Sequence, residues 1–281
     1  MSDPIRRLSE ELARDPSSLV FLQLGEALRR SGQLDLAYKV AVRGLERHAH
    51  NADAHDLLAR IYVDRDELQS AFDEWDMVLR LAPAHVGARK GMGYILFKQG
   101  KLGAAEEQLS TAASQDNGDP SITTALRMVR RLLRYAPNRD NGATALGPAE
   151  LAAAQLRVEE EARLLFADIL RDGEHTAMLL NTDGMVTAGV YLTSDGRDVA
   201  QEVGAQLSGV RDEAARVVRH LDLGAWKAIV YETDVATVAL GPALDDSLVL
   251  VAAARSIPLG FVRRVLERCV QRATAWLGEV G

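Results

Sequence analysis

Three consecutive blocks of 34 residues decide the fold of the N-terminal half of the chain. They read SLVFLQLGEALRRSGQLDLAYKVAVRGLERHAHN (18–51), ADAHDLLARIYVDRDELQSAFDEWDMVLRLAPAH (52–85) and VGARKGMGYILFKQGKLGAAEEQLSTAASQDNGD (86–119). Small residues let two helices approach closely, and large apolar residues spaced by threes and fours fill the space between them. Six aligned columns show this pattern: Leu24, Leu58 and Met92; Gly25, Ala59 and Gly93; Leu28, Tyr62 and Leu96; Leu34, Leu68 and Leu102; Ala37, Ala71 and Ala105; Ala41, Trp75 and Leu109.

The period and the order of small and large residues resemble the tetratricopeptide repeat. The resemblance covers three repeats, 18–51, 52–85 and 86–119, and implies an all-α solenoid. Residues 120–134 are typical of a closing helix, which a solenoid needs because its last repeat has no neighbour. We therefore predict a repeat domain over 1–134 and a linker over 135–148, where Pro, Gly and Asn are frequent.

Tetratricopeptide arrays bind peptides or protein segments in a concave groove. Chaperone-binding members hold a terminal carboxylate with Lys and Asn at set columns, and the absence of Asn here makes a co-chaperone role less favoured. Aromatic anchors contribute disproportionately to binding, so the block from Lys90 to Lys98 is the favoured hot spot. The alternative is that the charges form a solvated face. The resemblance places six candidate binding residues in the groove: Arg29, Arg60, Lys90, Tyr94, Phe97 and Lys98.

The pattern changes after Gly173, where short apolar stretches alternate with turn signals such as Asp183-Gly184. Successive strands joined by short turns favour an antiparallel sheet. Residues 149–281 therefore predict an α+β domain with a five-stranded antiparallel sheet. We expect helices at 149–171, 197–221 and 259–280, and strands at 175–181, 185–191, 226–233, 235–240 and 247–254.

This order of elements resembles the roadblock / dynein light chain family over about 160–279. The stretches that carry the resemblance are NTDGMV (181–186), LGAWKAIVYE (223–232) and SLVLVAAARSIPLGFVRRVLERC (247–269). Members of the family dimerise and form platforms for Ras-like small GTPases, including the bacterial GTPase of gliding motility. The resemblance implies a homodimer and a small Ras-like GTPase partner, and it carries over no catalytic residue. Another small α+β sensor-like domain, such as a profilin or PAS shape, is the alternative fold.

The family's dimer suggests where a second copy would bind. Small residues beside the apolar stripe of helix 197–221 would admit a partner helix, and strand 226–233 would be an edge that pairs with its mate. The alternative is that these residues pack on their own sheet. The candidate interface residues are Gly204, Ser208, Ala215, Lys227, Ile229 and Tyr231.

Motifs for catalysis are missing from the sequence. It has no Walker motif, no G-x-S-x-G elbow and no H-E-x-x-H pair. Cys269 is the only cysteine and has apolar neighbours, so we expect it to be buried. His48, His50 and His55 lie close together, but no carboxylate or sulfur completes an obvious metal site. We expect no enzymatic activity, no cofactor and no metal.

The net charge of −7 argues against nucleic acid as a partner. Residues 1–135 carry 19 basic and 19 acidic side chains, and residues 136–281 carry 14 and 21, so neither half is basic. The clearest apolar run, 248–254, is far shorter than the ~20 residues that span a bilayer. We expect a cytoplasmic protein with no membrane insertion.

Two functions of different kinds remain open. The favoured one is a non-enzymatic adaptor, whose roadblock-like dimer binds a small GTPase while the repeats recruit an unidentified protein or peptide. The alternative is a small-molecule or signal-sensing domain fused to a repeat scaffold. A GTPase platform needs an exposed, protein-sized face, whereas a sensor needs a concave apolar pocket. A third interpretation is a repeat scaffold whose second domain only dimerises.

Overall fold

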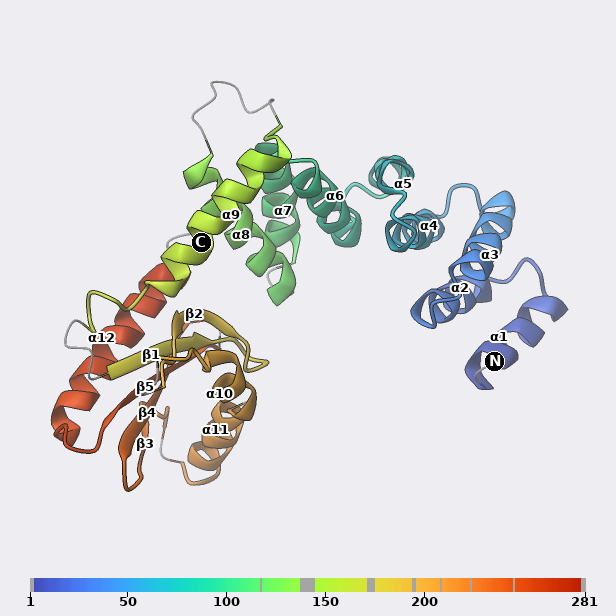
Figure 1. The fold of residues 1–281 in the computed structure, drawn as a ribbon. Helices are drawn as coiled ribbons and strands as arrows, with labels where there is room; N and C mark the ends of the chain where they lie inside the picture. Colours follow the sequence, from blue (N-terminus) through green and yellow to red (C-terminus); the bar gives the residue numbers. More distant parts are fainter. Residues whose placement is uncertain are drawn as a thin grey trace. The chain divides into compact units, whose positions relative to one another are not determined.

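The computed structural model describes residues 3–116, 118–136, 145–170, 175–193, 196–207, 209–222, 224–244 and 246–278. The chain forms two compact units, Met1–Ala152 and Ala153–Gly281. The first unit is helical and the second contains the sheet (Figure 1). The predicted fold class, a tetratricopeptide-like array followed by an α+β domain, is confirmed.

The first unit consists of antiparallel helix pairs that recur every 34 residues. The second helices of the three pairs begin at Leu34, Leu68 and Leu102, which occupy one column of the sequence repeat. The helices are α1 (Asp3–Arg14), α2 (Val20–Arg30), α3 (Leu34–Arg47), α4 (Ala52–Asp64), α5 (Leu68–Leu81), α6 (Val86–Lys98), α7 (Leu102–Gln115) and α8 (Pro120–Tyr135). Helix α9 (Pro148–Arg163) crosses the boundary between the units.

The small residues of the repeat lie where helices touch. Ala37, Ala71 and Ala105 are completely buried. A Cβ atom on Gly25 would lie 2.7 Å from Leu57 Cδ2, and one on Gly93 would lie 2.8 Å from Leu109 Cγ. These distances are shorter than van der Waals contact, so a larger residue at either glycine would force the leucine side chain to shift.

Part of the predicted linker contacts the repeats. Residues 137–144 lie outside the described residues, but the amide of Leu146 donates a hydrogen bond of 3.0 Å to the carbonyl oxygen of Gly100. The Leu146 side chain is buried. The segment just before α9 therefore packs on the turn between α6 and α7.

The contribution of this contact to stability can be measured by comparing two glycines that occupy the same position in different repeats. Gly32 and Gly100 both have left-handed backbones, with φ of 76° and 71°. A Cβ on Gly32 would meet nothing within 4 Å, whereas one on Gly100 would overlap the Leu146 carbonyl oxygen. We expect Gly32→Ala to cost about 1 kcal/mol through φ alone, and Gly100→Ala to cost at least about 1 kcal/mol more. Urea unfolding of both variants measures the difference, and equal costs would contradict the contact.

The second unit is built on a five-stranded antiparallel sheet with strand order β2-β1-β5-β4-β3. Strands β2 and β3 are therefore its edges. The strands are β1 (His175–Leu180), β2 (Val186–Val190), β3 (Ile229–Glu232), β4 (Ala236–Pro242) and β5 (Leu248–Ala254). The helices that follow α9 are α10 (Ala200–Gln206), α11 (Val210–His220) and α12 (Leu259–Gly278).

Each face of the sheet has its own core, because alternate residues of the central strands point to opposite sides. On one face, Leu179 and Val251 pack with Leu266 and Cys269 of α12 and with Phe166. On the other, Met178, Leu250 and their neighbours pack with residues of α10 and the start of α11. Figure 1 shows α12 on one side of the sheet and α10 and α11 on the other.

Two predicted helices of this unit are wrong in extent. The helix expected over 197–221 is divided into α10 and α11, because Gly209 adopts a left-handed φ of 85°. The helix expected over 149–171 ends at Arg163, and turns over 164–169 direct Leu165 and Phe166 into the core beneath α12. Both interruptions change which apolar residues face the sheet.

Candidate functional site

The groove residues of the first two repeats form one network of ion pairs. Arg29 Nε lies 2.9 Å from Glu26 Oε2, and Arg29 Nη1 lies 2.6 Å from Asp64 Oδ2. Arg60 lies between Glu26 and Asp56, at 2.9 Å from each carboxylate. Glu26 is also 2.6 Å from Arg30. The sequence predicted that Arg29 and Arg60 share a face, and the structure brings them together around Glu26.

Glu26 is the centre of this network. The hydrogen bond from Arg29 is the largest influence on its carboxylate, followed by burial, which opposes it, and then by Arg30 and Arg60. Together they lower the pKa of Glu26 from 4.5 to about 2. A lowered folded-state pKa means that ionised Glu26 stabilises the fold above pH 4.5 and stops doing so as the pH falls through about 2.

We expect Glu26→Gln to destabilise the first unit at neutral pH by about 1–3 kcal/mol, since three arginines lose a shared carboxylate. The difference from the unaltered protein should shrink as the pH falls from 4.5 towards 2. Urea unfolding at several pH values measures it. Glu107→Gln, at an exposed position on α7, is the control and should change little. A loss of stability in Glu26→Gln that does not change with pH would contradict the role of the Glu26 charge.

The third repeat presents a different surface. Tyr94 is 44% exposed, and the Lys98 ammonium lies 5.9 Å from the centre of its ring. Phe97 is half-buried on the same helix. Lys90 Nζ donates hydrogen bonds to Asp119, at 3.0 Å, and to Ser121, which ties the start of α8 to α6. Of the predicted hot spot, Tyr94 and Lys98 are the accessible members.

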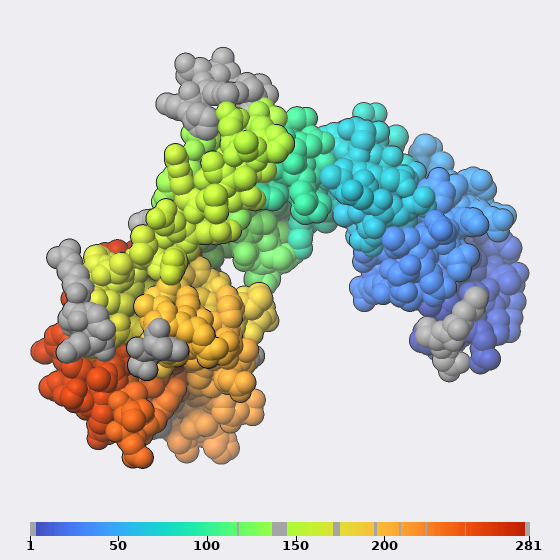
Figure 2. Space-filling view, viewed as in Figure 1, coloured from blue at the N-terminus to red at the C-terminus, as the bar shows by residue number. Residues whose placement is uncertain are grey.

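The second unit leaves apolar side chains near the end of α11 and a sheet edge exposed. Helix α11 is described from end to end, and none of its residues is buried. Val217 is 47% exposed, and Leu221, just after the helix, is 57% exposed. Figure 2 shows α10 and α11, in orange, at the surface of this unit. Edge strand β3 carries Tyr231, which is 41% exposed. Burial, the larger cause, and the nearby Tyr191 raise the pKa of Tyr231.

The candidate interface residues lie in different environments. Ala215 is half-buried on α11, Lys227 is exposed before β3, and Ile229 packs partly on the core beneath α10. Ser208 lies outside the described residues. Gly204 is buried inside its own unit, where a Cβ would lie 2.5 Å from the Gly184 carbonyl oxygen. The prediction that Gly204 admits a partner helix is therefore corrected, because the β1–β2 hairpin already occupies that space.

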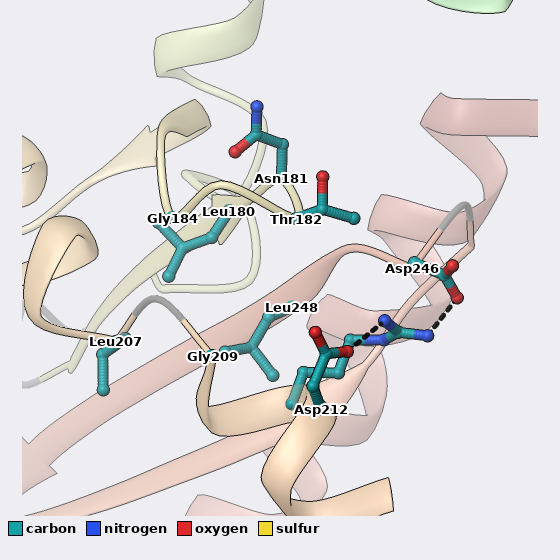
Figure 3. Close-up of a pocket in the computed structure, with 10 residues that line it drawn as sticks. Leu180, Asn181, Thr182, Gly184, Leu207, Gly209, Asp212, Asp246 and Leu248 are labelled. Atoms are coloured by element: carbon teal, nitrogen blue, oxygen red, sulfur yellow. Dashed lines mark hydrogen bonds and ion pairs between the residues drawn. The ribbon is translucent and has the colours of Figure 1, made fainter. Parts of the chain in front are cut away.

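A small pocket lies where the β1–β2 hairpin, the α10–α11 junction and the β4–β5 turn meet (Figure 3). Arg211 contacts Asp212 at 3.0 Å and also pairs with Asp246, which fixes the start of α11 to the β4–β5 turn. The cavity measures about 20 Å³, room for about one water molecule. It is far too small for an organic ligand, since such pockets measure about 300–1,000 Å³.

A larger groove, of about 490 Å³, lies between the segment before β3 and α12. Ala228, Leu266 and Val270 supply its apolar part. Its polar lining is Lys227, Arg263, Glu267 and Gln271. The groove is open at the sheet edge, so it differs from the concave apolar pocket that a sensor requires.

The other candidate groups have structural partners. His55 lies 2.6 Å from Glu74 and 3.0 Å from the Ala49 carbonyl oxygen, and His48 stacks on Phe21. Cys269 is buried as expected, and burial raises the pKa of its thiol to about 12. Among the described residues, no His, Cys, Asp or Glu side chains gather in threes at a spacing that suits a metal ion. Within the same residues, no helix has the length and apolar character needed to cross a membrane.

Solved structures that resemble parts of this chain include both predicted fold types. The first TPR of Spaghetti (RPAP3) bound to HSP90 peptide SRMEEVD is 18% identical, with a TM-score of 0.41, and the match covers 42% of this chain and 94% of that one. MamA is 19% identical, with a TM-score of 0.42 and coverages of 56% and 88%. The gliding protein MglB from Thermus thermophilus is 18% identical, with a TM-score of 0.38 and coverages of 43% and 92%. No family model matches the chain, and no curated protein matches it significantly.

Sequence reasoning missed two exposed residues. Met128 occupies the column of Tyr94 one repeat later and is 38% exposed, so α8 continues the groove as the first helix of a fourth repeat. The 34-residue register was the signal that could have found it. Val217, within the helix predicted over 197–221, is 47% exposed, and the sequence alone did not distinguish it from the other apolar residues of that helix.

Proposed function

We propose that the chain is a non-enzymatic adaptor. Its second unit forms a homodimer through α11 and the edge strand β3, and the dimer binds a small Ras-like GTPase. The repeats recruit a second protein. The observation that carries this proposal is α11, an amphipathic helix without a buried residue.

Two features of the surface support dimerisation. An isolated helix of 11 residues is marginal in water, so α11 needs a further surface to cover its apolar side. Within the part of the chain that the structure describes, the backbone of β3 is paired only with β4, and an open sheet edge is a template for another strand. A second copy related by two-fold symmetry would cover both features with the same residues.

The GTPase partner rests on the resemblance to the roadblock family. In that family the sheet platform of the dimer acts on the GTPase's own machinery, so no catalytic residue is assigned here. The groove of about 490 Å³ is the feature that would favour a sensor, and its four polar side chains and open edge make the adaptor the preferred function.

The first test is the mass of the full chain in solution. Light scattering at tens of micromolar should give twice the 30.6 kDa of one chain. The second is binding to small Ras-like GTPases of the source organism, loaded with GDP or with a non-hydrolysable GTP analogue. A monomer would overturn the dimer. A dimer that binds no GTPase in either state would leave a scaffold that only dimerises.

A further inference from the structure

Helix α12 packs mainly on the central strands of the sheet and leaves space beside the β3 edge. A Cβ atom on Gly241 of β4 would lie 3.0 Å from Val270 Cγ2, so the helix and the strand touch there. A helix is about 10 Å across and neighbouring strands lie about 4.8 Å apart, so one helix covers about two strands. The groove of about 490 Å³ between α12 and the segment before β3 is the space left at this edge.

The apolar lining of this groove is recessed. Ala228 is exposed, Val270 is half-buried and Leu266 is buried, although all three line the groove. A flat surface such as a lipid bilayer could touch the rim of the groove but not this lining. Side chains that project from a protein segment could reach it, and anchors that fill a pocket supply much of the binding energy in protein interfaces.

Charged and polar side chains surround the apolar lining. Arg263, Glu267 and Gln271 are spaced by four residues, so they lie on one side of α12. Lys227 comes from the segment before β3. In the part of the chain that the structure describes, Lys227, Arg263 and Glu267 form no ion pair with another residue. The groove therefore offers two unpaired cations and one unpaired carboxylate.

Positive charge is concentrated on α12. The helix carries four arginines and one acidic residue, whereas residues 136–281 as a whole carry 14 basic and 21 acidic side chains. Arg272 pairs with Asp168 at 2.6 Å, and the Arg264 guanidinium lies 5.8 Å from the centre of the Phe261 ring. The charge beside the groove therefore favours a partner that carries negative charge.

We propose that this groove binds an acidic segment of a partner protein, separately from the repeats and from α11. Aliphatic or aromatic side chains of the segment pack on Ala228 and Val270, and its carboxylates face Lys227 and Arg263. Glu267 accepts a hydrogen bond from the backbone of the segment. A protein segment is favoured over a small molecule because the groove is open along the sheet edge, whereas small ligands are mostly buried in their pockets.

Selection of random twelve-residue peptides on the full chain tests this proposal. The displayed library is first depleted on the Ala228→Trp variant, whose larger side chain fills the groove without changing its charge. This step removes peptides that bind the repeats or other surfaces, and it does not presuppose an acidic sequence. The peptides that remain should be rich in Asp and Glu and should contain an aliphatic or aromatic residue.

The affinity of the best peptide, synthesised with blocked ends, is then measured by fluorescence anisotropy. Arg263→Glu and Lys227→Glu should each weaken binding by about tenfold or more, because each places a carboxylate against those of the peptide. The affinity of the unaltered protein should fall as salt is raised, because exposed charges are screened. Arg157→Glu, at an exposed position on α9, makes the same charge change outside the groove lining and should leave the affinity unchanged.

Two measurements show that a loss of binding comes from the groove itself. All four substituted side chains are exposed, so circular dichroism should show an intact fold. Light scattering should give each variant the same mass as the unaltered protein. A loss of peptide binding accompanied by a change of mass would show that a second copy of the chain occupies the groove, and would overturn the proposal.

Other outcomes would also overturn it. Recovery of neutral or basic peptides would contradict the acidic partner. Recovery of no peptide, or equal affinities for Arg263→Glu and the unaltered protein, would show that the groove is not the binding surface. The proposed GTPase partner and dimer are tested by GTPase binding and by the mass of the unaltered chain, so either proposal can fail without the other.

Discussion

Replacing Gly204 by arginine is expected to unfold the second unit rather than to separate two intact subunits. A Cβ at this position would lie 2.5 Å from the Gly184 carbonyl oxygen and 2.9 Å from Leu180 Cδ2. The carbonyl belongs to the β1–β2 turn and Leu180 is buried, so neither can move cheaply. The guanidinium would also lose water without gaining a partner. Together these effects should cost about 3 kcal/mol or more.

Ala205→Arg is the matched control for this substitution. Ala205 is the next residue of α10 and is exposed, so the same side chain should be tolerated there. Thermal unfolding followed by circular dichroism compares the two variants. A Gly204→Arg protein as stable as the control would show that α10 can move away from the hairpin.

Placing a charge on α11 is expected to convert the proposed dimer into monomers. Val217→Glu puts a carboxylate on the exposed apolar side of the helix, where two copies would bury it twice. We expect the dissociation constant of the dimer to rise by about thirtyfold or more, the effect of losing a hot spot of ~2 kcal/mol. Since Val217 is not buried within its own unit, the unit should remain folded.

Analytical ultracentrifugation over a range of concentrations measures this change. Met185→Glu is the control, because Met185 is an exposed apolar residue of the β1–β2 turn and belongs to neither α11 nor β3. An unaltered dimer in Val217→Glu would place the interface elsewhere. A monomeric parent protein would remove the dimer altogether.

The repeats were predictable because the same packing requirement recurs in three consecutive blocks of the sequence. A single small residue such as Gly25 means little, but Gly25, Ala59 and Gly93 in one column show that helices touch at that place in each repeat. The bounds of α3, α5 and α7 follow the period closely. Which charges pair across the groove was not predictable, because the partners of Glu26 depend on distances between helices.

The second unit contains two glycines whose structural roles could not be predicted from one sequence. Gly204 correctly signalled a close approach, but a small residue does not reveal whether the approaching atom belongs to its own chain or to a second copy. Gly209 resembles many tolerated helix glycines in sequence, and only its left-handed φ reveals that it separates α10 from α11. That separation determines which apolar residues remain exposed.

The exposure of α11 has a consequence for how the unit fluctuates. Strands β1, β4 and β5 are secured by the two cores, so their amide hydrogens should exchange slowly at any protein concentration. The protection of the α11 amide hydrogens from exchange depends on a second copy if the helix is covered only in the dimer. Their protection should therefore rise with protein concentration, by mass action, while that of the central strands stays constant. Subunit association would then act as the final folding step of this helix.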